Sequence, residues 1–454
     1  MALPDLIEIV PLDQPMRAEI TVPGSKSITN RALTLAALAD GEVTLAGALW
    51  SEDTQIMVEC LQKLGFEIRV ENDPEEFCNR TITVKGLNGK IPNAGTVEKP
   101  LELFVGNAGT AARFLSAFVC LGDGIYRLSG VLRMHERPQA ALFSALRELG
   151  YRVESENGND KLPVKIYGVE VGSARCAERT PQRGVPTKLC KVSIEESSQF
   201  ASALLLCAKV GNWKVEVIGE NAEESPYVEL TEQICDYFSR GRRAIRSKPN
   251  SHSFSFAIDP DASSKSYFWA AEWMFKTSFT QWPTASPVGF QIDTNFYNYK
   301  TKNLPQFTSR KTDLGDSIMT AIVIAPFAGY EVKFTDLGRL RVQETERVVA
   351  LRTELTRCGA KVVEEGDTLT VWPSPLHGAE IETYNDHRMA MCFAILGLKV
   401  PGIKIKNPAC VKKTFPNFFQ KLAAQPPHGL GVEIWEIKNG RRTRKLNADD
   451  LFAD

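Results

Sequence analysis

A turn, two cations and several hydrogen-bonding side chains are concentrated between Val22 and Arg31. A proline-glycine pair ends a strand predicted over Glu19–Val22, and the serines and threonine that follow can cap an apolar helix predicted to begin near Arg31. Free N–H groups at a helix start favour anions, and Lys26 and Arg31 add positive charge beside them. The stretch therefore predicts a phosphate or carboxylate site, although such a helix start is by itself more often a plain surface feature.

The same features recur along the chain as a repeat. Each copy has a polar start, a helix of small and apolar residues, a glycine and a short strand; the copies start near Lys26, Asn107, Ser197, Asp261, Gly315 and Asn385. In the copy at Asp261 the following strand cannot be assigned. Three copies continue with a second, amphipathic helix that ends at Gly65, Gly150 or Gly359 and leads into another strand. A period of about seventy residues is too long for a solenoid and predicts a βαβαββ unit copied six times.

The first helix of each copy is hydrophobic almost all round, which predicts that it is buried. If the polar N-termini of these helices point one way, their partial positive charges converge on one cleft. Such a cleft suits a small molecule that carries several negative charges.

Composition is typical of a soluble enzyme. Lys and Arg number 54 against 55 Asp and Glu, a formal net charge of -1 that argues against nucleic-acid or membrane partners. The ten cysteines form no C-x-x-C motif and the five histidines are dispersed. We therefore expect reduced core cysteines and no metal. The start of the chain lacks the features of a signal peptide, so we expect a cytoplasmic protein.

Eight motifs, in order, resemble the 5-enolpyruvylshikimate-3-phosphate (EPSP) synthase family over roughly residues 15 to 424. They begin at Lys26, Gly106, Arg133, Ser197, Asp261, Arg341, Tyr384 and Lys413. The resemblance is weak from about 236 to 312. It implies an α/β fold, a two-lobed inside-out α/β barrel of six βαβαββ repeats. We expect residues 1–24 and 257–424 to form one lobe, with one degenerate repeat, and residues 25–256 the other; residues 425–454 are an extension of unknown role.

The resemblance also implies a reaction: transfer of the enolpyruvyl group of phosphoenolpyruvate to the 5-hydroxyl of shikimate 3-phosphate, without a cofactor, in a monomer. By similarity, phosphoenolpyruvate is bound by Lys26, Asn107, Gly109, Thr110, Arg133, Gln199, Arg347, His387, Arg388 and Lys413. By similarity, shikimate 3-phosphate is bound by Lys26, Ser27, Arg31, Ser197, Ser198, Gln199, Ser225, Tyr227, Asp316, Arg339 and Gln343. Arginine, with its planar fork of donors, suits both phosphate and carboxylate.

The reaction needs at least two proton-transfer groups. Asp316 is the candidate base at the 5-hydroxyl, and Glu344 is the candidate to work with Lys26 at the methylene carbon. Each has a simpler reading: Asp316 as a helix N-cap, and Glu344 as a surface carboxylate paired with a neighbouring arginine. His387 is more simply a structural, hydrogen-bonding residue than a base.

Several positions depart from the family pattern. Arg339 stands where relatives have Asn, and Gln343 where they have Lys. We therefore expect Arg339 to bind the 3-phosphate and Gln343 to make a neutral contact. Glu224 replaces a Ser of the family, so Ser225 is expected to substitute for it. Phe114 replaces a Pro near Gly109, the glycine against which the family's inhibitor glyphosate lies, and we expect partial glyphosate tolerance.

Two other functions stay open at this point. A related enzyme transfers the same enolpyruvyl group to UDP-N-acetylglucosamine, and a catalytically silent paralogue would bind a phosphorylated ligand without turnover. The serine-arginine pattern at Ser27 and Arg31 fits the shikimate substrate better, whereas Gln343 and Glu224 keep the silent paralogue open.

Overall fold

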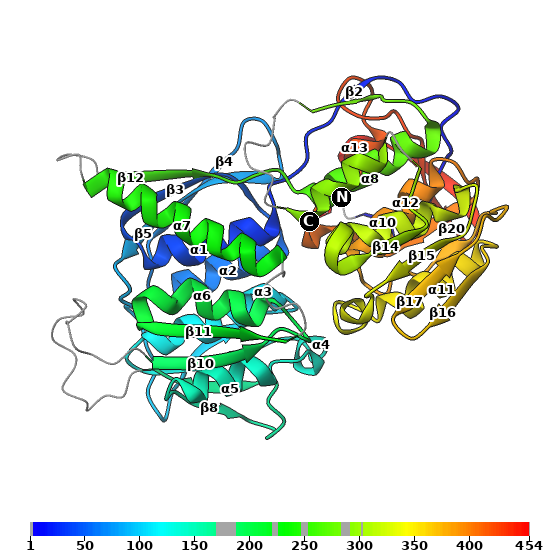
Figure 1. The fold of residues 1–454 in the computed structure, drawn as a ribbon. Coiled ribbons are helices and arrows are strands. Elements are labelled where there is room, and N and C mark those ends of the chain that lie inside the picture. Colours follow the sequence, from blue (N-terminus) through cyan, green and yellow to red (C-terminus); the bar gives the residue numbers. More distant parts are fainter. Residues whose placement is uncertain are drawn as a thin grey trace. The chain divides into compact units, whose positions relative to one another are not determined.

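The computed structural model describes residues 3–168, 188–219, 226–246, 253–282, 291–300 and 303–453. The chain packs into two compact units, which we describe one at a time (Figure 1). Unit 1 comprises Met1–Ser25, Pro74–Asn79 and Asp259–Asp454, and unit 2 comprises Lys26–Asp73 and Arg80–Ile258.

Unit 2 contains three sheets, with strand orders β12-β3-β5-β4, β6-β7-β9-β8 and β10-β11. Its helices are α1 (Lys26–Leu38), α2 (Glu52–Lys63), α3 (Gly109–Phe118), η1 (Val119–Leu121), α4 (Leu132–Glu136), α5 (Ala140–Glu148), α6 (Gln199–Gly211) and α7 (Pro226–Arg246). Its strands are β3 (Asp40–Leu49), β4 (Ile68–Asn72), β5 (Asn79–Leu87), β6 (Leu101–Phe104), β7 (Ile125–Ser129), β8 (Arg152–Ser155), β9 (Val164–Tyr167), β10 (Lys188–Ser193), β11 (Trp213–Ile218) and β12 (Ser253–Ala257).

Unit 1 also contains three sheets, ordered β14-β15-β17-β16, β18-β19-β1-β20-β21 and β13-β2. Its longer helices are α8 (Ala262–Phe275), α10 (Ile318–Ile324), α11 (Arg347–Arg357), α12 (His387–Gly397) and α13 (Phe418–Ala423). Its short helices are η3 (Ile292–Phe296), α9 (Tyr297–Lys300), η4 (Arg310–Leu314), η5 (Gly315–Ser317), η6 (Ala325–Phe327), η7 (Gly338–Val342), η8 (Pro408–Lys413) and η9 (Ala448–Leu451). Its strands are β1 (Leu6–Ile9), β2 (Ala18–Glu19), β13 (Thr280–Gln281), β14 (Phe307–Ser309), β15 (Val332–Thr335), β16 (Val362–Glu365), β17 (Thr368–Val371), β18 (Glu380–Ile381), β19 (Ile403–Lys406), β20 (Ile434–Lys438) and β21 (Arg441–Leu446).

The predicted repeat is present in both units. In unit 2, β6–α3–β7–α5–β8–β9 forms a sheet in which β7 is parallel to β6 and antiparallel to β9. In unit 1, β14–α10–β15–α11–β16–β17 has the same strand order and the same pairing directions. The copy that begins with α8 is reduced, because in the described residues its following strand β13 has two residues and pairs with β2.

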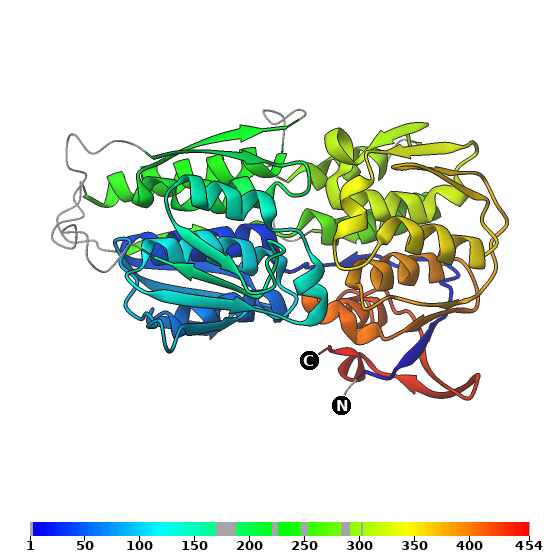
Figure 2. The same ribbon diagram turned by 90° about the horizontal axis from the view of Figure 1, so that it is seen from below.

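The first helices of the repeats are buried, as predicted. All ten residues of α3 and all seven of α10 are buried. Helices α1, α3 and α6 contact one another inside unit 2, and α8, α10 and α12 do so inside unit 1 (Figure 2). The second helices end as predicted at Gly65, Gly150 and Gly359, whose φ angles of 94°, 84° and 92° lie in the left-handed region that glycine adopts without steric cost.

Helix α1 begins at Lys26, about one turn earlier than predicted. The residues before it are held by the chain segment that returns from unit 2, since the Ser25 amide donates to the Asp259 carbonyl (2.8 Å) and the Asp261 amide to that of Pro23 (2.9 Å). These two bonds keep Pro23–Ser25 extended, so the first helical residue is Lys26.

The continuous lobe predicted over residues 25–256 needs one correction. Pro74–Asn79 packs with unit 1. Its buried Glu76 carboxylate accepts a hydrogen bond from Asn417 Nδ2 (2.7 Å) and pairs with Lys421 Nζ (2.8 Å), while Asn79 Oδ1 accepts from the Gly24 amide (2.8 Å). Polar contacts of this kind leave no periodic signal in the sequence.

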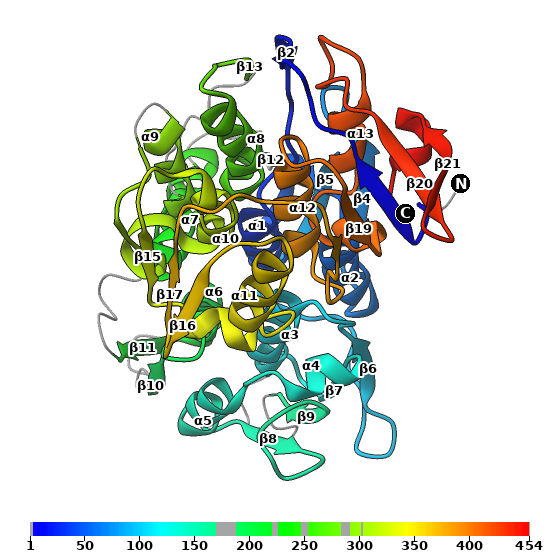
Figure 3. The same cartoon turned by 90° about the vertical axis from the view of Figure 1, so that its right-hand side faces the viewer.

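The extension from Gln425 belongs to the sheet of the last repeat. Strand β1 pairs antiparallel with both β19 and β20, and β21 then forms the sheet edge (Figure 3). Comparison with β6-β7-β9-β8 shows that β20 takes the place of β8. The extension therefore completes a repeat.

Replacing Ile434 by alanine tests this role. Ile434 is buried, so Ile434→Ala should reduce the free energy of unfolding of unit 1 by about 2–4 kcal/mol. Denaturant unfolding measures the change, with Thr443→Ala on the exposed edge strand as the control. Equal stability of both variants and wild type would contradict the role.

Candidate active site

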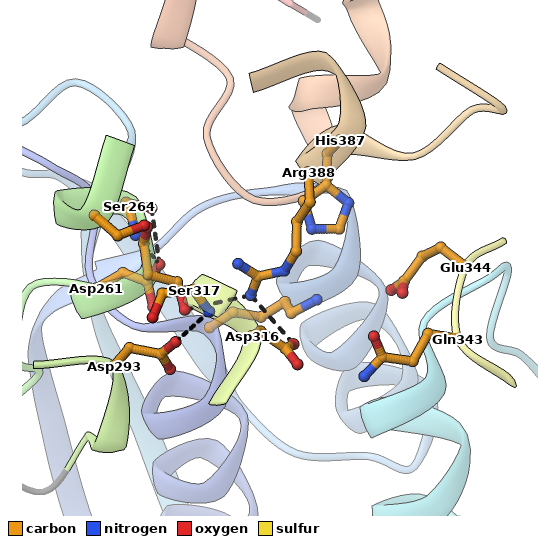
Figure 4. A network of polar contacts seen from close by, with 12 residues as sticks. Asp261, Ser264, Asp293, Asp316, Ser317, Gln343, Glu344, His387 and Arg388 are labelled. Atoms are coloured by element: carbon orange, nitrogen blue, oxygen red, sulfur yellow. Dashed lines mark hydrogen bonds and ion pairs between the residues drawn. The ribbon is translucent and has the colours of Figure 1, made fainter. Parts of the chain in front are cut away.

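A cluster of charged side chains lies at the N-terminal ends of α10 and α12 in unit 1 (Figure 4). Asp316 is at its centre. Its Oδ1 is 2.6 Å from Arg310 Nη2, and its Oδ2 is 3.4 Å from Arg388 Nη2 and 4.0 Å from Arg347 Nη1. Arg388 in turn donates to Ser263 Oγ at the start of α8 (3.4 Å), so the starts of three first helices meet here.

These contacts set the protonation state of Asp316. Burial by itself raises the pKa of the carboxyl group, but the guanidinium groups of Arg388, Arg310 and Arg347 outweigh it and hold the pKa well below its usual range. Asp316 is therefore ionised at neutral pH. A further negative charge beside these arginines would make it more basic.

Arg347 is the most enclosed cation of the cluster, with a side chain 1% exposed. Its Nε donates to Asp386 Oδ2 (2.7 Å) and its Nη2 lies 2.8 Å from Glu344 Oε2. Glu344 also pairs with Lys413 Nζ (3.2 Å) and is only 9% exposed. The reading of Glu344 as a surface carboxylate is therefore wrong; it is held between two buried cations.

Arg347 Nη1 also donates to Gln343 Oε1. Gln343 follows η7, the short helix that carries Arg339, whose side chain is half-buried. The other arginine of η7, Arg341, turns away from Glu344, because it pairs with Glu346 (2.6 Å), Glu364 (2.8 Å) and Asp367 (3.0 Å).

The segment before α12 has an unusual backbone. Tyr384 and Asn385 both have φ 54°, a left-handed conformation that is costly for residues other than glycine. The Tyr384 hydroxyl donates to the buried Glu354 (2.8 Å), which helps to hold this turn. This turn places Asp386 and His387 at the start of α12. Asp386 caps the helix by accepting a hydrogen bond from the Arg388 amide (2.9 Å), and Nδ1 of the buried His387 lies 3.9 Å from Asp386 Oδ1.

Asp316 does not cap α10. The amide of Ser317 donates instead to Oδ1 of Asp293 (2.6 Å), a buried residue of η3 (Figure 4). The N-cap reading of Asp316 is therefore wrong, because its carboxylate faces arginines. Burial and the negative charge of Asp316 raise the pKa of Asp293 to about 6.

In unit 2, Lys26 opens α1 and pairs with Asp53 in the first turn of α2 (2.9 Å). The Lys26 side chain stays 19% exposed, whereas Asp53 is buried. Asp53 thus fixes the ammonium group while leaving part of it accessible.

A second group in unit 2 links the starts of α3 and α6. Gln199 accepts from Arg113 Nη1 (2.7 Å) and donates to Thr110 Oγ1 (3.1 Å). Gly109 lies against two guanidinium groups: a Cβ added there would be 2.7 Å from Arg137 Nη1 and 2.8 Å from Arg113 Nη1. Arg137 also donates to the carbonyl of Asn107 (3.2 Å). This group therefore offers cations and helix N-termini suited to an anion.

Arg31 is almost fully buried. Its guanidinium donates to Thr231 Oγ1 (2.8 Å), Ser202 Oγ (3.0 Å) and the Ser27 carbonyl (2.9 Å), and it lies 5.4 Å from the ring centre of Phe114. Burial lowers its pKa to about 10, although the nearby Tyr227 opposes that shift. In this arrangement Arg31 joins α1 to α6 and α7.

Other predicted residues lie beside these groups. Ser198 is buried before α6, and the hydroxyl of Ser197 accepts from the Gln199 amide (3.3 Å). The carbonyl of Tyr227 accepts from Arg31 Nη2 (3.3 Å). Arg133 pairs with Glu136 on α4 (2.6 Å). Ser225 and Glu224 lie outside the described residues.

Sequence reasoning assigned no role to six residues that complete these clusters: Asp53, Arg113, Arg137, Asp293, Arg310 and Asp386. Arg137 and Asp386 stand inside the motifs that begin at Arg133 and Tyr384, so their position was a signal. Asp293 and Arg310 fall in the segment of weak resemblance, where no motif marked them.

Across the described ranges, the structure has no group of three or more His, Cys, Asp or Glu side chains placed to hold a metal ion. Among the helices it describes, none is long and apolar enough to cross a membrane.

Comparisons with known proteins agree with this geometry. The profile of EPSP synthase (3-phosphoshikimate 1-carboxyvinyltransferase) matches residues 11–280 and 300–422. The 3-phosphoshikimate 1-carboxyvinyltransferases of Trichormus variabilis and Opitutus terrae are each 36% identical to the chain. The first alignment covers 92% of this chain and 98% of the relative, and the second 93% and 98%.

Solved structures give the same fold. An EPSP synthase from Acinetobacter baumannii superposes with a TM-score of 0.65 at 20% identity, covering 94% of this chain and 99% of that one. The enolpyruvyl transferase NikO from Streptomyces tendae gives 0.60 at 14% identity, covering 96% and 99%. The predicted enolpyruvyl transferase fold is confirmed.

The raised pKa of Asp293 predicts a pH-dependent stability. The folded state binds a proton on the Asp293 carboxylate more tightly than the unfolded state does, because the ordinary pKa of this carboxyl is near 3.8. The resulting stabilisation is complete below about pH 4 and is lost as the pH rises through 6, at a cost of about 3 kcal/mol. Asp293→Asn should therefore unfold at a higher temperature than wild type at pH 8 and at a similar temperature at pH 4.

Calorimetry of both proteins at the two pH values makes the measurement. Glu272→Gln is the control, because Glu272 is another buried carboxylate that accepts backbone amides, from Phe279 (2.8 Å) and Thr280 (2.7 Å), outside the cluster. A gain for Asp293→Asn of equal size at both pH values would rule out the titration of Asp293 as its cause.

Proposed function

The chain belongs to the EPSP synthase (3-phosphoshikimate 1-carboxyvinyltransferase) family, and from this premise we propose how its residues divide the work of the family's reaction. The enzyme transfers the enolpyruvyl group of phosphoenolpyruvate to the 5-hydroxyl of shikimate 3-phosphate and releases phosphate. The observation that carries the assignment is the Asp316 carboxylate held among three arginines at the start of a buried helix.

Phosphoenolpyruvate presents a phosphate and a carboxylate close together, so its site needs several cations. We assign Arg347, Arg388 and Lys413 of unit 1 to it, with His387 beside them. In unit 2 we assign Lys26, Asn107, Gly109, Thr110, Arg133 and Gln199. The structure supports this choice because all three cations of unit 1 already pair with carboxylates, which an incoming anion can replace.

Shikimate 3-phosphate also carries a carboxylate and a phosphate. We assign the carboxylate to Ser27 and Arg31, and the phosphate to Ser197, Ser198 and Ser225 with Arg339. Gln199 and Tyr227 border the ring, and Gln343 makes a neutral contact. The placement of Ser197 and Ser198 at the start of α6 supports this, because backbone amides at a helix N-terminus bind phosphate.

Asp316 removes the proton of the 5-hydroxyl. Before substrates bind, its depressed pKa makes it a weak base. Binding of phosphoenolpyruvate anions to Arg347 and Arg388 offsets part of the positive charge, and the pKa of Asp316 rises. The base is therefore strengthened at the moment when the reacting hydroxyl is present.

Glu344 and Lys26 transfer protons to and from the methylene carbon of phosphoenolpyruvate. One proton is added there as the 5-oxygen attacks the neighbouring carbon, giving a tetrahedral adduct; elimination then removes a proton from the resulting methyl group while phosphate leaves. Glu344 lies between Arg347 and Lys413, two of the cations that we assign to phosphoenolpyruvate, which supports its place beside the reacting carbon. Fixed cations stabilise the adduct, which keeps its negative charge through both steps.

The alternatives are not favoured. The relatives named above, which match over nearly the whole chain at 36% identity, are 3-phosphoshikimate 1-carboxyvinyltransferases. A silent paralogue is at odds with Asp316, Glu344 and Lys26, which are all present and ion-paired.

We further propose a cytoplasmic monomer that binds glyphosate weakly. Gly109 supports binding of the inhibitor, because it has no side chain that would intrude on the anion site. A Cβ at this position would also come too close to the guanidinium groups of Arg137 and Arg113. Phe114, one turn later on α3, is buried against Arg31, so its packing influences where Gly109 lies.

Removal of the proton-transfer groups tests the assignment. Asp316→Asn and Glu344→Gln should each lower kcat by about 10²-fold or more, with a smaller effect on the affinity for shikimate 3-phosphate. Phosphate release from phosphoenolpyruvate, with shikimate 3-phosphate as acceptor, is the assay. Asp313→Asn, three residues earlier and bound to the Ser309 amide (2.8 Å), is the matched control and should keep kcat. Wild-type turnover of either variant would remove that residue from the chemistry.

Arg339 tests the assignment of the 3-phosphate. Arg339→Ala should raise the KM for shikimate 3-phosphate about tenfold or more, the effect of losing a charge-assisted hydrogen bond, and Gln343→Lys should partly restore it. Arg341→Ala on the same short helix is the control, because its guanidinium is engaged by three carboxylates. A normal KM in Arg339→Ala would show that another cation binds the phosphate.

A further inference from the structure

Asp293 is a buried carboxylate that the reaction scheme above does not use. Its side chain lies at the start of α10, and Oδ1 accepts the amide of Ser317 at 2.6 Å (Figure 4). That amide belongs to the peptide bond between Asp316 and Ser317. The hydrogen bond therefore acts on the backbone of Asp316 itself.

The helical turn η3, which carries Asp293, is anchored on both sides. The Gln291 side chain before it accepts from the Ala262 amide (3.0 Å) and donates to the Pro260 carbonyl (2.9 Å), so it is joined to the start of α8. Asn295 Nδ2 donates to the carbonyl of Asp313 in η4 (3.0 Å). These contacts make η3 a fixed support from which Asp293 can act.

The turn around Asp316 is held from a second direction. The hydroxyl of Ser317 donates to the Leu314 carbonyl (2.7 Å), and the Asp316 carboxylate points to Arg310 and Arg388. With the Asp293 bond, both the backbone and the side chain of this residue are constrained. Placement of a reacting group to within a fraction of an ångström is what such constraints provide.

Charged groups from the neighbouring elements act on Asp293. They are Asp261, which precedes α8, Asp316 on η5 and Arg388 on α12; Arg310 on η4 lies one step further away, paired with Asp316. Asp316 and Asp261 oppose ionisation of Asp293, whereas Arg388 and the hydrogen bond from Ser317 favour it. Ionised Asp293 is therefore a second negative charge beside the arginines that hold Asp316.

We propose that Asp293 is a positioning residue for Asp316: its hydrogen bond to the Ser317 amide fixes the turn that aims the Asp316 carboxylate at its proton. The inference rests on the proposed role of Asp316 as the base. Asp293 touches no reacting atom, and its effect on turnover passes through Asp316.

A double-mutant cycle tests this on the full-length enzyme. Asp293→Ala removes the acceptor and should lower kcat about tenfold, with little change in the KM for phosphoenolpyruvate. Asp293→Asn keeps an oxygen acceptor and should recover kcat to within about threefold of wild type at pH 8. In an Asp316→Asn background, Asp293→Ala should have no further effect on kcat, because the group that it positions is already lost.

The pH profile supplies an independent measurement. In wild type the acid limb of kcat/KM should contain a small step near pH 6, no larger than about threefold, from the ionisation of Asp293, and this step should be missing in Asp293→Asn. Glu272→Gln is the control for loss of a buried carboxylate in the same unit, and it should keep both the wild-type profile and kcat.

The results separate the possible failures. If Asp316→Asn keeps wild-type kcat, the proposed function of Asp316 fails. If Asp316→Asn is slow but Asp293→Ala lowers kcat by the same factor in both backgrounds, the positioning role is overturned. It is also overturned if Asp293→Ala alone keeps wild-type kcat, or if Asp293→Asn is as slow as Asp293→Ala.

Discussion

Burial of the first helix of each repeat is the constraint on which the rest of this structure depends. A helix without a polar face cannot lie on a surface, so α1, α3 and α6 pack against one another in unit 2, as α8, α10 and α12 do in unit 1. Most of the polar residues of these helices lie towards their starts, and packing the helices together gathers those starts. The charged clusters of each unit follow from this arrangement.

Gathering cations in a buried place creates a second requirement, which is that each cation has a negatively charged partner. An unpaired buried charge is very costly in free energy. Acidic side chains meet this requirement: Asp386 and Glu344 accompany Arg347, and Asp53 accompanies Lys26. In the scheme proposed above, the anionic substrates take over from such carboxylates as partners of the cations. Glu344 would then have two uses, because it pairs with buried cations and also transfers a proton.

The repeat, the buried helices and the glycine stops could be predicted, because each rests on the order of apolar and turn residues along the chain. The start of α1 was misplaced because it is decided by two hydrogen bonds, from the Ser25 amide to the Asp259 carbonyl and from the Asp261 amide to the Pro23 carbonyl, which join residues far apart in the sequence. The extension from Gln425 was not assigned, since its strands can be placed in a repeat only through their pairing with β1, at the other end of the chain. Within the site, the repeat marked Asp316 and a family motif marked Arg347, whereas Asp293 and Arg310 lie in the segment of weak resemblance, where no pattern pointed to them.

Asp293 shows how stability and function can oppose each other at one residue. Its burial beside another carboxylate lifts its pKa to about 6, so at neutral pH the fold carries an ionised group in an unfavourable place. An amide there would satisfy the same Ser317 N–H without that penalty, and stability alone would favour it. An aspartate instead places a negative charge near Asp316, and because the two carboxylates repel each other this charge slightly opposes the arginines that depress the pKa of Asp316, an effect small enough to agree with the modest change in kcat expected for Asp293→Asn. A destabilising charge at the start of α10 is what a site tuned for proton transfer would be expected to keep.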